Sequence, residues 1–287
     1  MSETPARPET PNFLEINWAK HPDKTALYGL DRSLTYDQLR QRARALAKSL
    51  YGLGVRPGDQ IAVMSYNLLE ITEISNALGY LEVGLVLVGF GMKPPEIEYI
   101  VTNSESRLLI FWHEFAERIL PNREKYPSVM QNGFYAFGSP VDGALELEDL
   151  FANPPDVDLE NLPPIEKVGS SMIYTSGTTG RPKGAARSTD FATKPGVMDY
   201  LFTSISFFRF DDSEVHLICC PLYHSAPSYF GTITFVMGGT MVYMPRFDAQ
   251  QFLELVDRHK VTSTHLVPTM ISRLLEVPTS FTEIGRA

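Results

Sequence analysis

The amino-acid sequence predicts an α/β fold in which mostly parallel sheets are flanked by helices. Short apolar runs, which indicate buried strands, alternate along the chain with amphipathic segments of helical period. The chain has 287 residues, which is long enough for one large domain or two ordinary ones. An apolar content of 44% and a charged content of 21% are ordinary for a soluble globular protein.

The first clear helix is predicted over residues 35–54. Thr35 and Gln38 form a capping-box pattern at its start, and Gly52 or Gly54 can end it. Five residues fall on one face of this helix and should face the core: Leu39, Ala43, Leu46, Ala47 and Leu50.

Further elements follow in regular alternation. Asn67 with Glu70 resembles a second helix start, and Pro94-Pro95 opens another helix. The predicted order is a strand over 61–65, a helix over 67–80, a strand over 84–90, a helix over 96–104 and strands over 107–112 and 133–138.

Residues 142–164 differ in composition from the chain before them. Acids and prolines dominate the stretch, and it has no sustained period. We interpret it as a surface connection with one short helical turn, which could separate two subdomains.

The alternation resumes after this connection. A strand over 170–176 leads into a glycine-rich loop and a long mixed segment. The remaining predicted elements are a strand over 214–220, a helix from 228, a strand over 240–244, a helix over 248–260, a strand over 262–267 and a helix from Pro268.

Two segments bear on targeting. The low-charge run over 228–244 is short for a membrane span and is broken by Gly238-Gly239, so it predicts a buried helix, turn and strand and no transmembrane segment. The polar, proline-rich residues 1–12 predict a flexible arm, because no basic region followed by an apolar stretch marks them as a secretory signal.

Charge and cysteine content narrow the function classes. The formal net charge of −9 argues against non-specific binding to nucleic acid or to an anionic membrane, although a nucleotide pocket needs only local positive charge. The two cysteines, Cys219 and Cys220, are adjacent, which excludes a disulfide framework and a spaced metal site. We expect them to be reduced core residues in a cytoplasmic protein.

The most informative stretch is MIYTSGTTGRPKGAARS, residues 172–188. Its order departs from both G-x-x-x-x-G-K-[ST] and G-x-G-x-x-G, the two common phosphate motifs. Its glycines still let backbone N–H groups approach an anion, its hydroxyls add donors, and Lys183 adds a charge suited to a terminal phosphate. On composition alone, a surface hairpin with turn residues is the alternative.

Within this stretch, YTSGTTGRPKG closely resembles the phosphate-loop signature of the adenylate-forming enzymes, which include acyl-CoA synthetases, peptide-synthetase adenylation domains and luciferases. Four other stretches are similar to conserved segments of that family and occur in the family's order: residues 34–39, 79–110, 220–227 and 245–270. The resemblance covers nearly the whole chain, and the pattern is most similar to fatty-acyl-CoA synthetases.

The resemblance implies a fold, a reaction and ligands. Residues 13–287 should form part of the large N-terminal domain of these enzymes. The implied reaction activates a fatty or other apolar carboxylic acid with ATP and Mg²⁺ to an acyl-adenylate, with release of pyrophosphate. Transfer to the thiol of coenzyme A then releases AMP. The expected partners are the acid, ATP and CoA, with no nucleic acid.

The resemblance also assigns site residues. His224, in CPLYHSAP, matches the family histidine beside the acyl carboxylate and α-phosphate, where it can orient the acid or gate the pocket; the alternative is a loop histidine with a structural role. The stretch after it should help to line the acyl site, with most of its side chains in ordinary core packing. No other histidine shows metal spacing. The residues expected to cradle the β- and γ-phosphates are Thr175, Ser176, Gly177, Thr178, Thr179, Gly180 and Lys183.

Later motifs of the family are not found in the sequence. These are the segments with the Mg²⁺-binding glutamate and the ribose-binding aspartate, and the small C-terminal lid domain. We therefore expect a truncated chain with weak or no catalysis on its own. Two alternatives stay open: an adenylating domain that loads an amino or aryl acid onto a carrier protein, and a non-catalytic remnant that binds ATP or an acyl chain.

Overall fold

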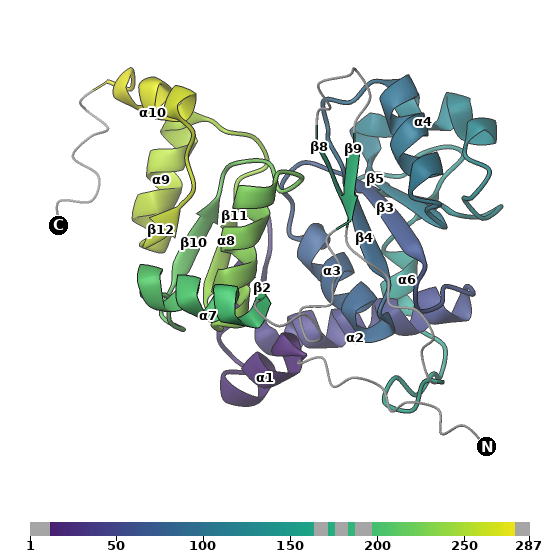
Figure 1. Cartoon of the computed structure of the whole chain (residues 1–287), viewed down its shortest axis with the longest axis horizontal. Helices are drawn as coiled ribbons and strands as arrows, with labels where there is room; N and C mark the ends of the chain where they lie inside the picture. The colour runs from purple at the N-terminus through teal and green to yellow at the C-terminus, as the bar shows by residue number, and fades with distance from the viewer. Residues whose placement is uncertain (1–11, 164–171, 176–182, 187–196, 279–287) are drawn as a thin grey trace. The chain divides into compact units, whose positions relative to one another are not determined.

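The computed structural model describes residues 12–163, 172–175, 183–186 and 197–278 and confirms the α/β architecture (Figure 1). The chain divides into two compact units. The first consists mainly of Gln41–Ser65 and Ile71–Met198, and the second of Phe13–Arg40, Tyr66–Glu70 and the residues from Asp199 onward. The predicted arm over 1–12 lies, except for Asn12, outside the described residues.

The first unit is built around a sheet whose described strands follow the order β7-β6-β5-β3-β4-β8-β9. Neighbouring strands are parallel, except that β8 and β9 form an antiparallel hairpin. All positions of the central strand β3 are buried, which explains its continuous apolar run. The strands are β3 (Gln60–Met64), β4 (Gly84–Val88), β5 (Leu108–Trp112), β6 (Phe134–Phe137), β7 (Leu145–Glu146), β8 (Met172–Thr175) and β9 (Lys183–Ala186).

Helices form the crossovers between several of these parallel strands. α3 leads from β3 to β4, and α4 leads from β4 to β5 (Figure 1). The helices are α2 (Tyr36–Gly52), which contributes to both units, α3 (Glu70–Leu81), α4 (Pro94–Asn103), α5 (Ala116–Ile119) and α6 (Asp149–Ala152), with short 3₁₀ segments at His113–Phe115 and Leu120–Lys125.

The second unit holds a sheet with the strand order β12-β10-β11-β1-β2 among its described residues. Its pairs are parallel except β1 with β2. The strands are β1 (Thr25–Tyr28), β2 (Ser33–Thr35), β10 (Val215–Ile218), β11 (Thr240–Tyr243) and β12 (Ser263–Thr264). The helices are α1 (Phe13–Lys20), α7 (Val197–Phe208), α8 (Ser225–Val236), α9 (Ala249–His259) and α10 (Pro268–Leu275).

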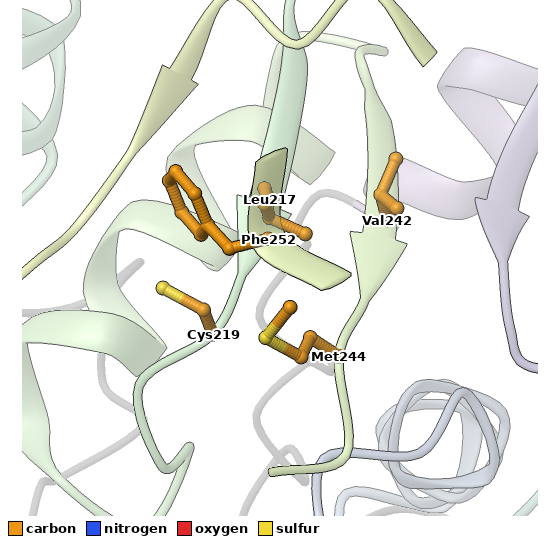
Figure 2. Close-up of a cluster of buried hydrophobic side chains, with 5 residues drawn as sticks. All are labelled: Leu217, Cys219, Val242, Met244 and Phe252. Carbon is orange, nitrogen blue, oxygen red and sulfur yellow. The ribbon is translucent and has the colours of Figure 1, made fainter. Parts of the chain in front are cut away.

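Two helices cover opposite faces of this second sheet. Gly231 of α8 approaches Ile218 and Met241, whereas Phe252 of α9 packs in a cluster with Leu217 and its neighbours. Because successive strand residues point to opposite faces, these contacts place α8 on one side and α9 on the other. The α9 cluster, drawn in Figure 2, comprises Leu217, Cys219, Val242, Met244 and Phe252.

The predicted start of α2 is confirmed in detail. The backbone N–H of Thr35 donates to Gln38 Oε1 at 2.9 Å, and the backbone N–H of Gln38 donates to Thr35 Oγ1 at 3.2 Å, which completes the capping box. The helix ends at Gly52, and Gly54 follows with a positive φ of 95°. The five residues predicted to face the core are fully buried: Leu39, Ala43, Leu46, Ala47 and Leu50.

Other boundaries differ from the predictions. α3 begins at Glu70, and Asn67 does not cap it because its side chain binds elsewhere. α8 begins at Ser225, three residues before the predicted start. The sequence also gave no prediction for α1, β1 and β2, which are short.

Residues 142–164 lie inside the first unit in the part that the structure describes. They contain the expected helical turn, α6, and also the edge strand β7, which pairs with β6. Arg42 binds Glu148 and Arg44 binds Glu160, so two ion pairs hold this acidic stretch to α2.

The low-charge run over 228–244 forms the predicted helix, turn and strand: most of α8, a turn at Gly238 with a positive φ of 80°, and β11. None of the helices in the described ranges is long and apolar enough to cross a membrane. Cys219 and Cys220 are buried and form no disulfide, as expected.

Candidate functional site

The glycine-rich loop emerges from the β8–β9 hairpin of the first unit. Thr175, the last residue of β8, pairs with Lys183, the first residue of β9. β8 runs parallel to β4, so the loop leaves the sheet at the carboxyl end of a parallel strand, where α/β sheets bind ligands. The backbone of Thr175 and Lys183 is thus placed at the two ends of the loop. The other predicted phosphate-binding residues lie outside the described residues: Ser176, Gly177, Thr178, Thr179 and Gly180.

Tyr174 supports this hairpin through contacts that sequence analysis did not predict. Its buried hydroxyl donates a hydrogen bond to Asn103 Oδ1 at 2.9 Å, at the carboxyl end of α4. Its ring meets the Tyr99 ring edge-on, with centroids 6.5 Å apart. Burial raises the pKa of Tyr174 to about 12, so the phenol stays protonated at neutral pH and can donate. The partner is far away in the sequence, which leaves no local signal.

His224 lies in the second unit, immediately before α8. Its backbone is extended, with φ −92° and ψ 150°, and its carbonyl accepts a hydrogen bond from Ser228 N at 3.3 Å. His224 is an exposed residue, although its imidazole contacts the Tyr223 ring, with centroids 4.5 Å apart. Burial lowers the pKa of His224 from its ordinary value, which favours the neutral ring. A neutral, accessible imidazole after a parallel strand can accept or donate one hydrogen bond to a ligand.

Asn67 holds the segment that leads to His224. Its Nδ2 donates to the carbonyls of Cys220 and Met244, at 3.0 and 3.3 Å, and its Oδ1 accepts from Leu222 N at 3.0 Å. The side chain is buried, with 3% of its surface exposed. Asn67 therefore ties together the chain just beyond β10 and just beyond β11. The sequence signal at this position had predicted a helix start.

An aromatic cluster surrounds Phe230, two turns into α8. Phe208 meets Phe230 edge-on at 5.4 Å between centroids, and His265 stacks against it at 5.6 Å. Ile233 and Thr234, further along the same helix, are fully buried. The helix after His224 thus adds a few buried residues to the core and presents an aromatic surface at Phe230.

His216 packs inside the second unit. It is buried, its Nδ1 lies 2.8 Å from Ser263 Oγ, and its ring stacks on Phe230. Burial, helped by the neighbouring His265, lowers the His216 pKa to about 4. Over the described ranges, no group of three or more His, Cys, Asp or Glu side chains is arranged to hold a metal ion.

The site residues thus fall into two groups. Thr175, Lys183 and Tyr174 belong to the first unit, whereas His224 and Asn67 belong to the second. Each group stands at the carboxyl ends of parallel strands in its own sheet, the position from which such sheets present ligand-binding loops.

Comparison with known proteins gives one consistent result. The family model described as "AMP-binding enzyme" matches residues 14–284. A 2-succinylbenzoate–CoA ligase of Bacillus licheniformis is 29% identical over 92% of this chain and 51% of its own length. The medium/long-chain-fatty-acid–CoA ligase FadD8 of Mycobacterium tuberculosis is 29% identical over 92% of this chain and 46% of its own.

A solved structure shares the fold. The N-terminal domain of FACL13 from Mycobacterium tuberculosis superposes with a TM-score of 0.80 at 23% identity, over 95% of this chain and 66% of that one. The chain spans about half the length of the curated relatives it matches.

Proposed function

Because this chain belongs to the AMP-binding enzyme family, we propose that it carries the phosphate-binding and acid-binding parts of an acid–CoA ligase. The observation that supports this most directly is the β8–β9 hairpin, whose loop begins at Thr175 and returns at Lys183. A hairpin that returns on itself at a strand end can present backbone N–H groups and one lysine to the same anion.

The chemistry explains why such a site is needed. A carboxylate is a poor electrophile, because it is anionic and its leaving group would be oxide. Attack of the carboxylate oxygen on the α-phosphorus of ATP breaks the bond to pyrophosphate and forms an acyl-adenylate. A thiol then attacks the acyl carbon and expels AMP. Both steps concentrate negative charge, which fixed donors stabilise.

Within this proposal the glycine-rich loop binds the β- and γ-phosphates. Lys183 supplies the positive charge, and the residues from Thr175 to Gly180 supply hydroxyl and backbone donors. Mg²⁺ in nucleotide sites is held largely by the phosphates with one or two carboxylates, so it would enter with ATP and needs no protein cage. Its chemistry is to neutralise phosphate charge.

His224 is proposed to contact the acid. Its lowered pKa favours the neutral ring at neutral pH. A neutral ring can orient the carboxylate of the acid without forming a tight ion pair, which would reduce the nucleophilicity of the carboxylate oxygen. The aromatic surface at Phe230, on the same helix, favours an apolar acid. We therefore propose a fatty or other apolar acid as substrate, CoA as thiol acceptor and the cytoplasm as the location.

The test is nucleotide binding by the purified chain, measured by isothermal titration calorimetry with Mg-ATP. We expect Lys183→Met to weaken ATP binding at least tenfold, whereas Lys125→Met, a half-exposed lysine of the same unit, should leave it unchanged. Equal affinities of the two variants would overturn the assignment of the loop.

Turnover is measured separately. Pyrophosphate release is measured with Mg-ATP and a panel of fatty, aryl and steroid acids. Each acid is tested with CoA, with a carrier protein, and without either acceptor. Release that depends on apolar acids and CoA supports the proposed substrates. ATP binding without release supports a chain that needs further residues for catalysis.

A further inference from the structure

Asn67 makes contacts that its neighbourhood in the sequence does not explain. The residue follows β3 in the chain, yet its side chain binds three backbone groups that lie more than 150 positions later, at Cys220, Leu222 and Met244. Its own backbone N–H donates to Pro245 O at 3.3 Å. The amide therefore uses both its N–H donors and its oxygen on the ends of two parallel strands.

From these bonds we propose that Asn67 is a positioning residue, which fixes the segment from Cys220 to His224 and thereby places the His224 imidazole at the carboxyl end of β10. This inference rests on the proposed function, because the placement of His224 matters only if His224 contacts the acid. Asn67 itself need not touch the acid or the nucleotide.

The segment has other ties at its two ends: Cys220 Sγ donates to His265 O at 3.1 Å, and His224 O accepts from Ser228 N at 3.3 Å. Between these ends, His224 N donates to Pro221 O at 3.1 Å, and Leu222 N donates to Asn67 Oδ1 at 3.0 Å. Without Asn67, the N–H of Leu222 and the carbonyl of Cys220 would lose their partners in a buried setting.

The other end of the bridge is rigid. Met244 accepts from Asn67 through its carbonyl, while its side chain lies fully buried in the cluster with Leu217 and Phe252 (Figure 2). Tight packing around Met244 restricts movement of its backbone. Asn67 thus transfers the position of a packed strand end to the segment before α8.

A second buried asparagine provides a matched control. Asn17 has 1% of its surface exposed, and its Nδ2 donates to Phe235 O at 2.6 Å, at the carboxyl end of α8. Asn17 therefore supports the same helix in the same unit, but at the end away from His224. Its replacement should cost stability without moving His224.

The experiment is a titration of the histidine Cε1–H signals by NMR in the purified chain. In wild type, burial lowers the pKa of His224. In Asn67→Ala the released segment should lose the contacts that partly bury the ring, so the His224 pKa should rise toward its ordinary value; in Asn17→Ala it should stay as in wild type. His259, whose ring lies 4.4 Å from the Tyr28 ring in the same unit, is the internal reference. An unchanged His224 titration in folded Asn67→Ala would overturn the inference.

Two further readouts cover the cases in which a variant fails to fold or the chain fails to bind ligand. Asn67→Ser retains a small hydroxyl and should show an intermediate shift. In wild type, the Leu222 amide should exchange with solvent as slowly as the strand amides of β10; exchange as fast as an exposed amide would contradict the bond to Asn67.

Binding of a non-hydrolysable acyl-adenylate analogue separates this inference from the proposed function. Asn67→Ala should weaken analogue binding about tenfold, and Asn17→Ala should not. Wild-type chain that does not bind the analogue would argue against the proposed function, while the titration still decides whether Asn67 places His224.

Discussion

Arg42 of α2 donates hydrogen bonds from its two terminal nitrogens to the two carboxylate oxygens of Glu148, at 2.8 and 2.9 Å. Its Nε also binds the carboxylate of Glu73, a fully buried residue of α3, and its guanidinium lies 4.0 Å from the centre of the Phe151 ring. Burial opposes the charge of Arg42, but the bonds to the two glutamates outweigh it and raise the Arg42 pKa. One side chain thus joins α2, α3 and the acidic stretch.

We expect Arg42→Met to lower the free energy of unfolding by about 3 kcal/mol, because a buried carboxylate loses its guanidinium partner. Glu148 is two-thirds exposed, so its pair contributes less than about 1 kcal/mol, and most of the loss comes from Glu73. Urea denaturation measures the change. Lys125→Met, which breaks a half-exposed pair with Glu98 at 3.9 Å, is the control and should cost under about 0.5 kcal/mol. Similar losses for both variants would contradict the prediction.

The capping box of α2 gives a second prediction. Thr35→Ala removes the acceptor for Gln38 N and should destabilise the chain by about 1 kcal/mol, whereas Thr35→Ser keeps the oxygen and should cost much less. Urea midpoints of the two variants provide the comparison. A loss that is equal for serine and alanine would show that the threonine methyl, not its oxygen, supports the helix.

Two helix-start patterns, at Thr35 and at Asn67, show which structural features can be predicted from the sequence. Thr35 and Gln38 interact across three positions, so their pattern is visible locally, and the helix start was predicted correctly. Asn67 and Glu70 have a similar local pattern, but three distant backbone groups compete for the asparagine side chain and take it.

In the candidate site, too, local sequence patterns could be recognised, whereas contacts between distant residues could not. The order of residues in the glycine-rich loop and the family resemblance were readable, and the family is now confirmed. The contacts that support the site could not be predicted. Tyr174 bonds Asn103, which lies 71 positions away in the sequence, and Asn67 bonds strand ends in a distant part of the chain. The roles of His224 and Lys183 stay predictions.

His216 should make stability depend on pH. Its pKa is about 4 in the folded chain, against an ordinary 6.5, so the unfolded chain binds the proton more readily between these values. The contribution of neutral His216 to the free energy of unfolding is fully present above pH 6.5. It falls as the pH drops toward 4, by at most about 3 kcal/mol. Unfolding is measured at pH 7 and pH 4.5 for wild type and His216→Gln.

The difference between the two proteins should shrink or reverse at pH 4.5, because glutamine has no proton to gain. Other acidic groups titrate in both proteins and cancel in this comparison. His113→Gln, which removes a ring 4.6 Å from the Trp112 ring in the first unit, serves as the control and should follow the wild-type pH dependence. Parallel pH curves for wild type and His216→Gln would contradict the assignment.

Tyr174 offers a test of how the hairpin is supported. Tyr174→Phe keeps the buried ring but loses the hydrogen bond to Asn103, so we expect a loss of about 1 kcal/mol in stability. β8 carries the loop directly after this residue, so a looser strand should also weaken Mg-ATP binding several-fold if the loop holds the phosphates. Tyr99→Phe, on the neighbouring ring, controls for changes in aromatic packing.

A double-mutant cycle with Asn103→Ala separates the bond from other effects of each substitution. If the Tyr174–Asn103 bond positions the hairpin, the double variant should bind ATP no more weakly than either single variant, because each removes the same interaction. Losses in ATP affinity that add up across the two positions would show that the residues act independently, and the bond would then have no role in holding the loop.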